Sequence, residues 1–143
     1  MRNLLPLALI LTLACASASK RPADIAEPEI SVRQAGPTFF GTTASTTLTF
    51  NVLVTNHAHV PLHLREIELS SPGMTHYVIQ RTVKRLDEVI PPGATRQVGM
   101  EANAYAEAPR AERFEPLNIR AVLRFEAAGK SWREVVLDQS IGS

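Results

Sequence analysis

The chain has 143 residues, with 15 basic and 14 acidic side chains. Hydrophobic residues make up 45% of it and charged residues 20%, proportions that suit a globular domain and exclude a disordered chain. If Arg2 is removed with a targeting segment, the basic count falls from 15 to 14 and equals the acidic count. The overall charge therefore gives no electrostatic case for a nucleic acid or an anionic membrane surface as partner.

Residues 1–18 are predicted to be a secretory signal peptide. Arg2 supplies the positive start, an apolar run covers residues 4–13, and small residues occupy 14–18. This order is typical of a cleaved leader, and the apolar run is too short to span a bilayer. We therefore expect the protein outside the cytoplasm, in the periplasm or anchored to the outer membrane.

A second ending for the leader is suggested by Thr12-Leu13-Ala14-Cys15, which resembles a bacterial lipobox with Thr where that motif usually has Leu. In this case residues 1–14 are removed and Cys15 becomes a lipidated first residue. Both endings stay open at this point. Cys15 is the only cysteine, so the rest of the chain forms no internal disulfide and its core alone must stabilise it.

The remainder is predicted to be a short tether followed by one β-domain. Residues 19–28 contain two prolines and mixed charge, which favours a linker over a packed element. From residue 29 to 143 the pattern alternates between apolar and polar positions and is interrupted by turn signals. It predicts an all-β, antiparallel, seven-stranded sandwich of the immunoglobulin or fibronectin-III kind. The expected strands cover 29–34, 47–55, 62–69, 77–83, 98–104, 117–127 and 132–137.

The alternation also predicts which side chains face the core. Phe50 and Val52 share one parity in their strand, and Leu123 and Phe125 share one in theirs, so all four should point inward. A change of parity at Arg65-Glu66 indicates a β-bulge. Around Trp132 the hairpin register stays open, because Trp132 differs in parity from Val135 and Leu137, which requires a bulge or a two-sided strand.

Three of the four histidines lie around one connection, between Asn56 and Pro61. His57 and His59 are two residues apart, so an extended chain would project them to the same side. Imidazoles of this kind hold Zn²⁺ or Cu²⁺ when a third ligand arrives, and His63 or His76 could supply it. The alternative is that they are polar residues of a connection on the surface at one end of the sandwich.

Other residues give no catalytic signature. The sequence contains no Gly-x-Ser-x-Gly elbow, no phosphate loop and no Gly-x-Gly-x-x-Gly fingerprint, so we expect neither an enzyme nor a cofactor. Acidic and basic residues are interspersed, which predicts no nucleic-acid stripe. The charged residues between Arg81 and Glu88 are expected to form a solvated rim, and one ring of Phe39-Phe40 to cover the end of the core.

Three segments together resemble a known family: Leu48 to Asn56, Val60-Pro61-Leu62, and Ile90 to Thr95. Over residues 29–104 the chain is similar to the late-embryogenesis-abundant type 2 domain, also called the water-stress and hypersensitive-response domain. It departs from that family in having Asn56-His57-Ala58 where the family usually has Asn-Pro-Asn.

The resemblance implies a fibronectin-III-like sandwich without catalytic residues, in a small secreted or lipid-anchored protein. We therefore expect a non-catalytic binding or structural module of the cell envelope. Its partners would be the membrane, through the lipid on Cys15, and an unknown envelope protein or ligand. The alternative is a periplasmic metal-binding protein that uses His57, His59 and His63.

Overall fold

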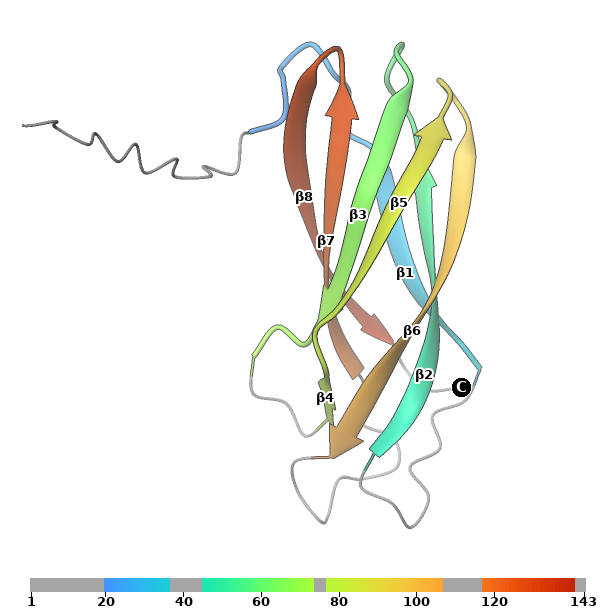
Figure 1. Ribbon diagram of the computed structural model, residues 1–143, viewed down its shortest axis with the longest axis vertical. Coiled ribbons are helices and arrows are strands. Elements are labelled where there is room, and N and C mark those ends of the chain that lie inside the picture. Colours follow the sequence, from blue (N-terminus) through green and yellow to red (C-terminus); the bar gives the residue numbers. More distant parts are fainter. Residues whose placement is uncertain (1–19, 37–44, 74–76, 107–116, 141–143) are drawn as a thin grey trace, which may run out of the picture.

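The computed structural model describes residues 20–36, 45–73, 77–106 and 117–140. Within these ranges the chain forms eight β-strands and no helix, arranged as two four-stranded antiparallel sheets (Figure 1). Among the described residues, accordingly, no helix is long and apolar enough to cross a membrane. The strands are β1 (Glu29–Ala35), β2 (Ser45–Thr55), β3 (Leu62–Ser70), β4 (Tyr77–Ile79), β5 (Thr82–Ile90), β6 (Thr95–Ala106), β7 (Leu117–Ala127) and β8 (Lys130–Ser140).

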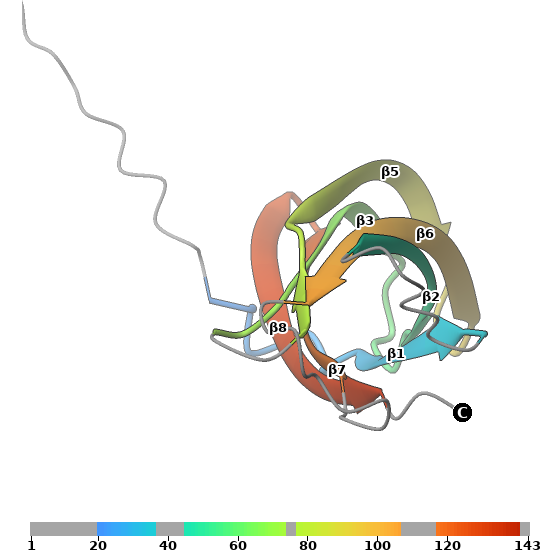
Figure 2. The ribbon, with the colours of Figure 1, turned by 90° about the horizontal axis from the view of Figure 1, so that it is seen from below.

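The two sheets have the strand orders β1-β2-β6-β4 and β5-β3-β7-β8. They curve around a common core, so that β1 approaches β8 along one side of the molecule and β5 approaches β6 along the other (Figure 2). The prediction of an all-β protein with two antiparallel sheets is confirmed. The predicted number of seven strands is wrong for the described residues, which contain eight.

The additional strand comes from residues 77–83, which were expected to form one strand and form parts of two. β4 pairs with β6 in one sheet, and β5 pairs with β3 in the other. The chain changes sheets at Gln80, whose N–H still donates to the Asn103 carbonyl of β6 at 2.8 Å. The charged residues expected at a solvated rim lie on β5, apart from Arg81, which directly precedes it. A charged edge strand discourages pairing with other chains.

Alternating apolar residues of both sheets form the core, as the sequence predicts. Phe50, Val52, Leu123 and Phe125 are fully buried, which confirms the predicted facing of both strands. The predicted bulge is also present, because the register of β3 against β5 and β7 shifts between Leu64 and Glu66. The extra residue restores the inward parity, so that Ile67 and Leu69 are buried together with Leu64.

The β7–β8 hairpin resolves the open register around Trp132. Its two turn residues, Ala128 and Gly129, have φ angles of 50° and 73°, as a tight two-residue hairpin turn requires. The strands then pair without a bulge from Ala127–Lys130 to Leu117–Ser140. Trp132 is buried, whereas Val135 and Leu137 are exposed on the outer face, so β8 is a two-sided strand.

The expected tether requires a correction, because its described part packs against the domain. Ile25 is 5% exposed and belongs to the core cluster, and Pro28 is buried as well. Arg21 forms ion pairs with Glu27 at 3.2 Å and with Glu134 of β8 at 3.4 Å. The composition of this segment resembles a linker, but one apolar side chain and one arginine attach it to the sandwich.

Candidate binding surfaces

Asn56 directly follows β2 and is completely buried, although it was expected in a surface connection. Its side-chain Nδ2 donates to the carbonyls of Val60 and Ile90, each at 2.9 Å, and its Oδ1 accepts from the N–H of Ala58 at 2.8 Å. Its backbone bonds to the turn before β6, from Asn56 N–H to Ala94 O at 2.9 Å and from Gly93 N–H to Asn56 O at 2.8 Å. Asn56 therefore connects two loops at one end of the sandwich.

The rest of that connection lies on the surface, as predicted, apart from Ala58, which is 4% exposed. His57 and His59 are exposed in the connection, while His63 is half-buried on β3. The His57 Nε2 lies 3.2 Å from a carboxylate oxygen of Glu29 on β1. In the described part of the chain, no three His, Cys, Asp or Glu side chains come close enough together to hold a metal ion.

Several residues of the sequence-based hypotheses lie outside the described ranges. These are the leader with Cys15, the pair Phe39-Phe40, and His76. The structure therefore places neither the predicted lipidation site nor the fourth histidine. The described residues contain no buried polar side-chain atom without a hydrogen-bond partner.

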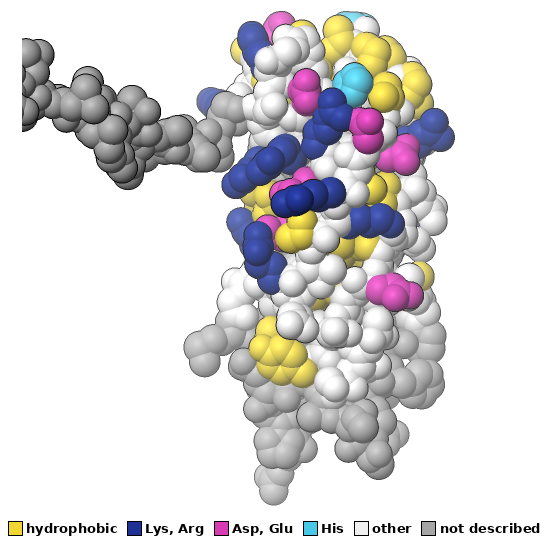
Figure 3. Space-filling model, in the orientation of Figure 1, with side chains coloured by type: hydrophobic (Ala, Val, Ile, Leu, Met, Phe, Trp, Pro, Cys, Tyr) yellow, Lys and Arg dark blue, Asp and Glu magenta, His cyan; other side chains and the backbone are white. Residues whose placement is uncertain are grey.

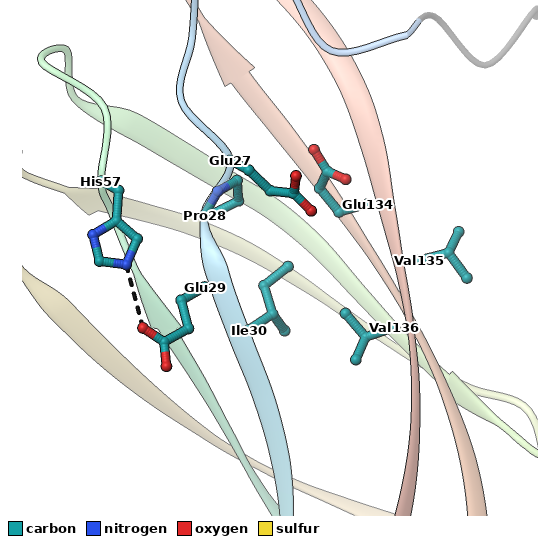
Figure 4. Close-up of a pocket in the computed structure, with 8 residues that line it drawn as sticks. All are labelled: Glu27, Pro28, Glu29, Ile30, His57, Glu134, Val135 and Val136. Atoms are coloured by element: carbon teal, nitrogen blue, oxygen red, sulfur yellow. Dashed lines mark hydrogen bonds and ion pairs between the residues drawn. The ribbon is translucent and has the colours of Figure 1, made fainter.

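A pocket of about 360 Å³ opens between β1 and β8 (Figure 4). His57 and Glu29 face each other at one side of it, and Arg21 pairs with both Glu27 and Glu134. The described lining offers no serine, threonine, cysteine or lysine nucleophile, so this pocket provides carboxylates and one imidazole only. Its lining residues are Glu27, Pro28, Glu29, Ile30, His57, Glu134, Val135 and Val136.

The outer face of the β5-β3-β7-β8 sheet carries the main concentration of charge. Five arginines lie on it or at its margin, and two glutamates of β3 lie among them. We call this set the arginine face, and Figure 3 shows Lys and Arg side chains gathered on this side of the molecule together with acidic and hydrophobic ones. Its charged members are Arg81, Arg85, Arg120, Arg124, Arg133, Glu66 and Glu68.

Each glutamate of the arginine face lies between an arginine of β7 and an arginine of β5 or of the segment just before β5. Glu66 is 3.7 Å from Arg85 and 3.9 Å from Arg124, measured from carboxylate oxygen to guanidinium nitrogen. Glu68 is 2.7 Å from Arg81 and 3.9 Å from Arg120. The glutamate side chains are 22% and 17% exposed, whereas those of Arg85 and Arg81 are 89% and 69% exposed. The surface of this face is therefore dominated by guanidinium groups.

The arginines also act on the ionisation of Glu68. The hydrogen bond from Arg81 lowers the pKa of Glu68, and the positive charges of Arg81, Arg120 and Arg133 add to this effect against the opposing effect of burial. Glu68 accordingly stays ionised at neutral pH. Counted by formal charge, five arginines against two glutamates give the face a local excess of +3.

Beyond the bulge the same sheet has a different charge pattern. Arg65 pairs with Asp87 of β5 and with Glu126 of β7, the latter at 3.1 Å. Two carboxylates surround one guanidinium there, so the excess positive charge does not extend to this part. The arginine face is thus bounded on one side by an acidic margin.

The sequence pattern does not reveal this surface, because its residues come from four strands and the segment before β5. Arg124 of β7 and Arg133 of β8 are direct cross-strand partners, a placement that follows only from the hairpin register. Like charges directly opposite each other destabilise a sheet. Only the finished register reveals this directly opposed arginine pair.

Comparisons with known proteins leave the family open. No family model matches the chain, and no curated protein matches it. The X-ray structure of Northeast Structural Genomics Consortium target SoR45 is similar with a TM-score of 0.54 at 8% identity, covering 80% of this chain and 85% of that chain. A protein from Archaeoglobus fulgidus has a TM-score of 0.45 at 12% identity, covering 80% and 95%. A FixG-related protein from Vibrio parahaemolyticus has a TM-score of 0.40 at 15% identity, covering 81% of this chain and 96% of that chain. The likeness to target SoR45 shows a shared fold and carries no activity to this chain.

Proposed function

We propose that this protein is a non-catalytic module of the cell envelope that binds its partner through the arginine face. The arginine face is the observation that carries the proposal. Its charged groups spread over a sheet surface and do not converge on a pocket with a nucleophile, an arrangement that suits recognition of an extended partner. The leader and Cys15, read from the sequence, provide export and a lipid anchor to the periplasmic side of a membrane.

The strand order supports an immunoglobulin or fibronectin-III type of sandwich. Constant-type immunoglobulin domains have one sheet of order A-B-E-D and one of order C-F-G. The sheet β1-β2-β6-β4 follows the first order, and β3-β7-β8 follows the second, with β5 added beside β3. This supports the resemblance to late-embryogenesis-abundant type 2 domains only at the level of architecture. Fold similarity alone leaves the ligand open.

The alternative function, periplasmic metal binding, has less support. His57 pairs with Glu29, and His63 lies on β3, so the described residues assemble no set of three ligands. A structural or catalytic zinc site needs at least three protein ligands at about 2 Å from the ion. Metal binding would therefore require the histidines to move together, whereas binding through the arginine face requires no movement of these residues.

Fractionation of cells that express the full chain tests the envelope location. We expect the wild type in the membrane fraction, in the detergent phase after phase separation, and labelled by radioactive palmitate. Cys15→Ser should abolish the label and release the protein, while Ser17→Ala serves as a matched control that keeps both. Unprocessed protein in the cytoplasm would contradict the proposed location, and processed but unlabelled protein would contradict the anchor alone.

Site-specific photo-cross-linking in the same cells tests the binding surface. A photoreactive amino acid in place of Leu137, on the outer face of β8, should give adducts with an envelope component. The control has the same photoreactive amino acid in place of Glu101, on the outer face of β6 in the opposite sheet, and should give few adducts. Equal adducts from both positions would argue against the arginine face as the binding surface.

A further inference from the structure

We infer that the arginine face docks on an anionic phospholipid surface. The inference rests on the proposed envelope location and names the partner of the same surface. The zero overall charge of the exported chain gives no reason to expect such a partner, whereas the distribution of the charges over the fold does. Three observations support it: the local excess of charge, the exposed apolar side chains beside it, and the position at which the N-terminal segment joins the domain.

The first observation is electrostatic. Five arginines against two glutamates leave an excess of +3 on one side of a chain that is nearly neutral overall. Arg124 and Arg133 oppose each other directly across β7 and β8, at a cost in sheet stability that a bound anion would relieve. Guanidinium groups pair with phosphate through two parallel hydrogen bonds, which suits phospholipid headgroups. Each basic residue near an anionic membrane surface raises the binding affinity about fivefold.

The second observation is the apolar surface next to the arginines. Leu137 is 68% exposed and lies directly opposite Arg120. Val135 is 54% exposed and follows Arg133 by two residues, on the same face of β8. Val83, on β5 at the other edge of the face, is 40% exposed. Aliphatic side chains that enter the headgroup region together with basic residues are typical of peripheral membrane binding. An acidic protein partner would pair with the arginines but would not require the exposed Leu137 at the β8 edge of the sheet.

The third observation concerns where the described chain begins. Lys20 is the first described residue, and the ion pair of Arg21 with Glu134 places this end of the chain beside β8. Four residues lie between Cys15 and Lys20, so the two are at most about 18 Å apart along an extended chain. A lipid on Cys15 would therefore hold the β8 edge of the sheet close to the bilayer. Anchor and arginine face would then act on the same membrane.

Vesicle co-sedimentation with the non-acylated full chain, carrying Cys15→Ser, tests the inference. The vesicles contain phosphatidylcholine either alone or mixed with phosphatidylglycerol. The face variant adds Arg124→Gln and Arg133→Gln. The matched control adds Arg33→Gln and Arg96→Gln, which remove the same charge from exposed positions of the opposite sheet. Every protein carries the same leader, so a difference in vesicle binding between the variants is due to the arginine face. Thermal unfolding verifies that each variant is folded.

We expect the parent chain and the matched control to bind the mixed vesicles more tightly than the neutral ones, and more weakly as salt is raised. The face variant should bind the mixed vesicles about 30-fold more weakly. Leu137→Ser should also weaken this binding, while Val89→Ser, which changes an exposed aliphatic residue on β5 outside the face, should not.

Equal binding by the face variant and the control would overturn the inference, as would equal binding to neutral and mixed vesicles. Face-dependent retention on immobilised polyglutamate without vesicle binding would overturn it in favour of an acidic protein partner. The vesicle assay does not depend on export, and cell fractionation does not depend on the face. Failure of this inference is therefore distinguishable from failure of the proposed envelope function.

Discussion

The ring of Trp132 stacks on that of Phe125, its direct cross-strand partner, with the ring centroids 5.7 Å apart and the ring planes 26° apart. Both side chains are completely or almost completely buried. The indole Nε1–H donates to Glu134 at 3.0 Å, so the only polar atom of the tryptophan has a partner. This contact fixes which face of β8 turns inward and consequently places Leu137 on the outer face.

Trp132→Ala is expected to lower the free energy of unfolding by about 3–5 kcal/mol, because it removes a buried aromatic side chain and leaves a cavity. Urea unfolding followed by far-UV circular dichroism measures the change, since Trp132 is the only tryptophan and fluorescence is lost with it. Val135→Ala, on the exposed face of the same strand, should stay within about 0.5 kcal/mol of the wild type. A midpoint for Trp132→Ala equal to that of the wild type would contradict the inward placement.

Asn56→Ala is expected to lower the free energy of unfolding by more than the substitution of a polar residue usually does. It leaves the carbonyls of Val60 and Ile90 and the N–H of Ala58 without their side-chain partner, at about 1–3 kcal/mol for each group that stays buried. His57→Ala, one residue later in an exposed position, is the control and should change stability by less than about 0.5 kcal/mol. Chemical denaturation compares the two, and similar midpoints would show that the buried hydrogen bonds contribute little.

Glu68 should contribute to the pH dependence of stability. Its pKa in the folded protein lies below the ordinary value of 4.5, chiefly because Arg81 donates a hydrogen bond to it. Protonation is then easier in the unfolded state. The contribution is present above about pH 4.5 and is lost as the pH falls through the lower, folded-state pKa.

Thermal unfolding between about pH 6 and pH 3 tests this effect of Glu68. The wild type should lose slightly more stability on acidification than Glu68→Gln, and the difference should shrink in high salt because Arg81 is well exposed. Glu101→Gln, on the opposite sheet, should follow the wild type. Parallel profiles for the wild type and Glu68→Gln would show that the arginine face does not act on this carboxylate.

Changing His57, His59 and His63 together to Ala tests the metal-binding alternative. We expect Zn²⁺ and Cu²⁺ to leave the melting temperature of the wild type unchanged, because the structure brings these histidines into no three-ligand set. If the alternative holds, micromolar metal should raise the melting temperature of the wild type and not of the triple variant. That gain should weaken below about pH 6, where imidazoles are protonated.

The class of fold and the composition of the core can be predicted from the amino-acid sequence. Alternation in β2 and β7 was sufficient to place Phe50 and Phe125 inside, because a strand has a period of two and the hydrophobic effect acts on each side chain individually. The bulge at Arg65-Glu66 could be predicted for the same reason, since an inserted residue leaves a visible change of parity. The leader and Cys15 remain predictions from the sequence, outside the described residues.

The pairing of the strands, and the composition of the outer faces that results from it, depend on contacts between distant parts of the chain. The division of residues 77–83 between two sheets depends on which neighbours they meet, and the burial of Asn56 depends on a carbonyl 34 residues away. The arginine face likewise exists because β5, β3, β7 and β8 lie side by side in one register, which brings Arg124 opposite Arg133. Periodicity along a strand carries no information about its partner strand, so a surface assembled from several strands is absent from the pattern of each one.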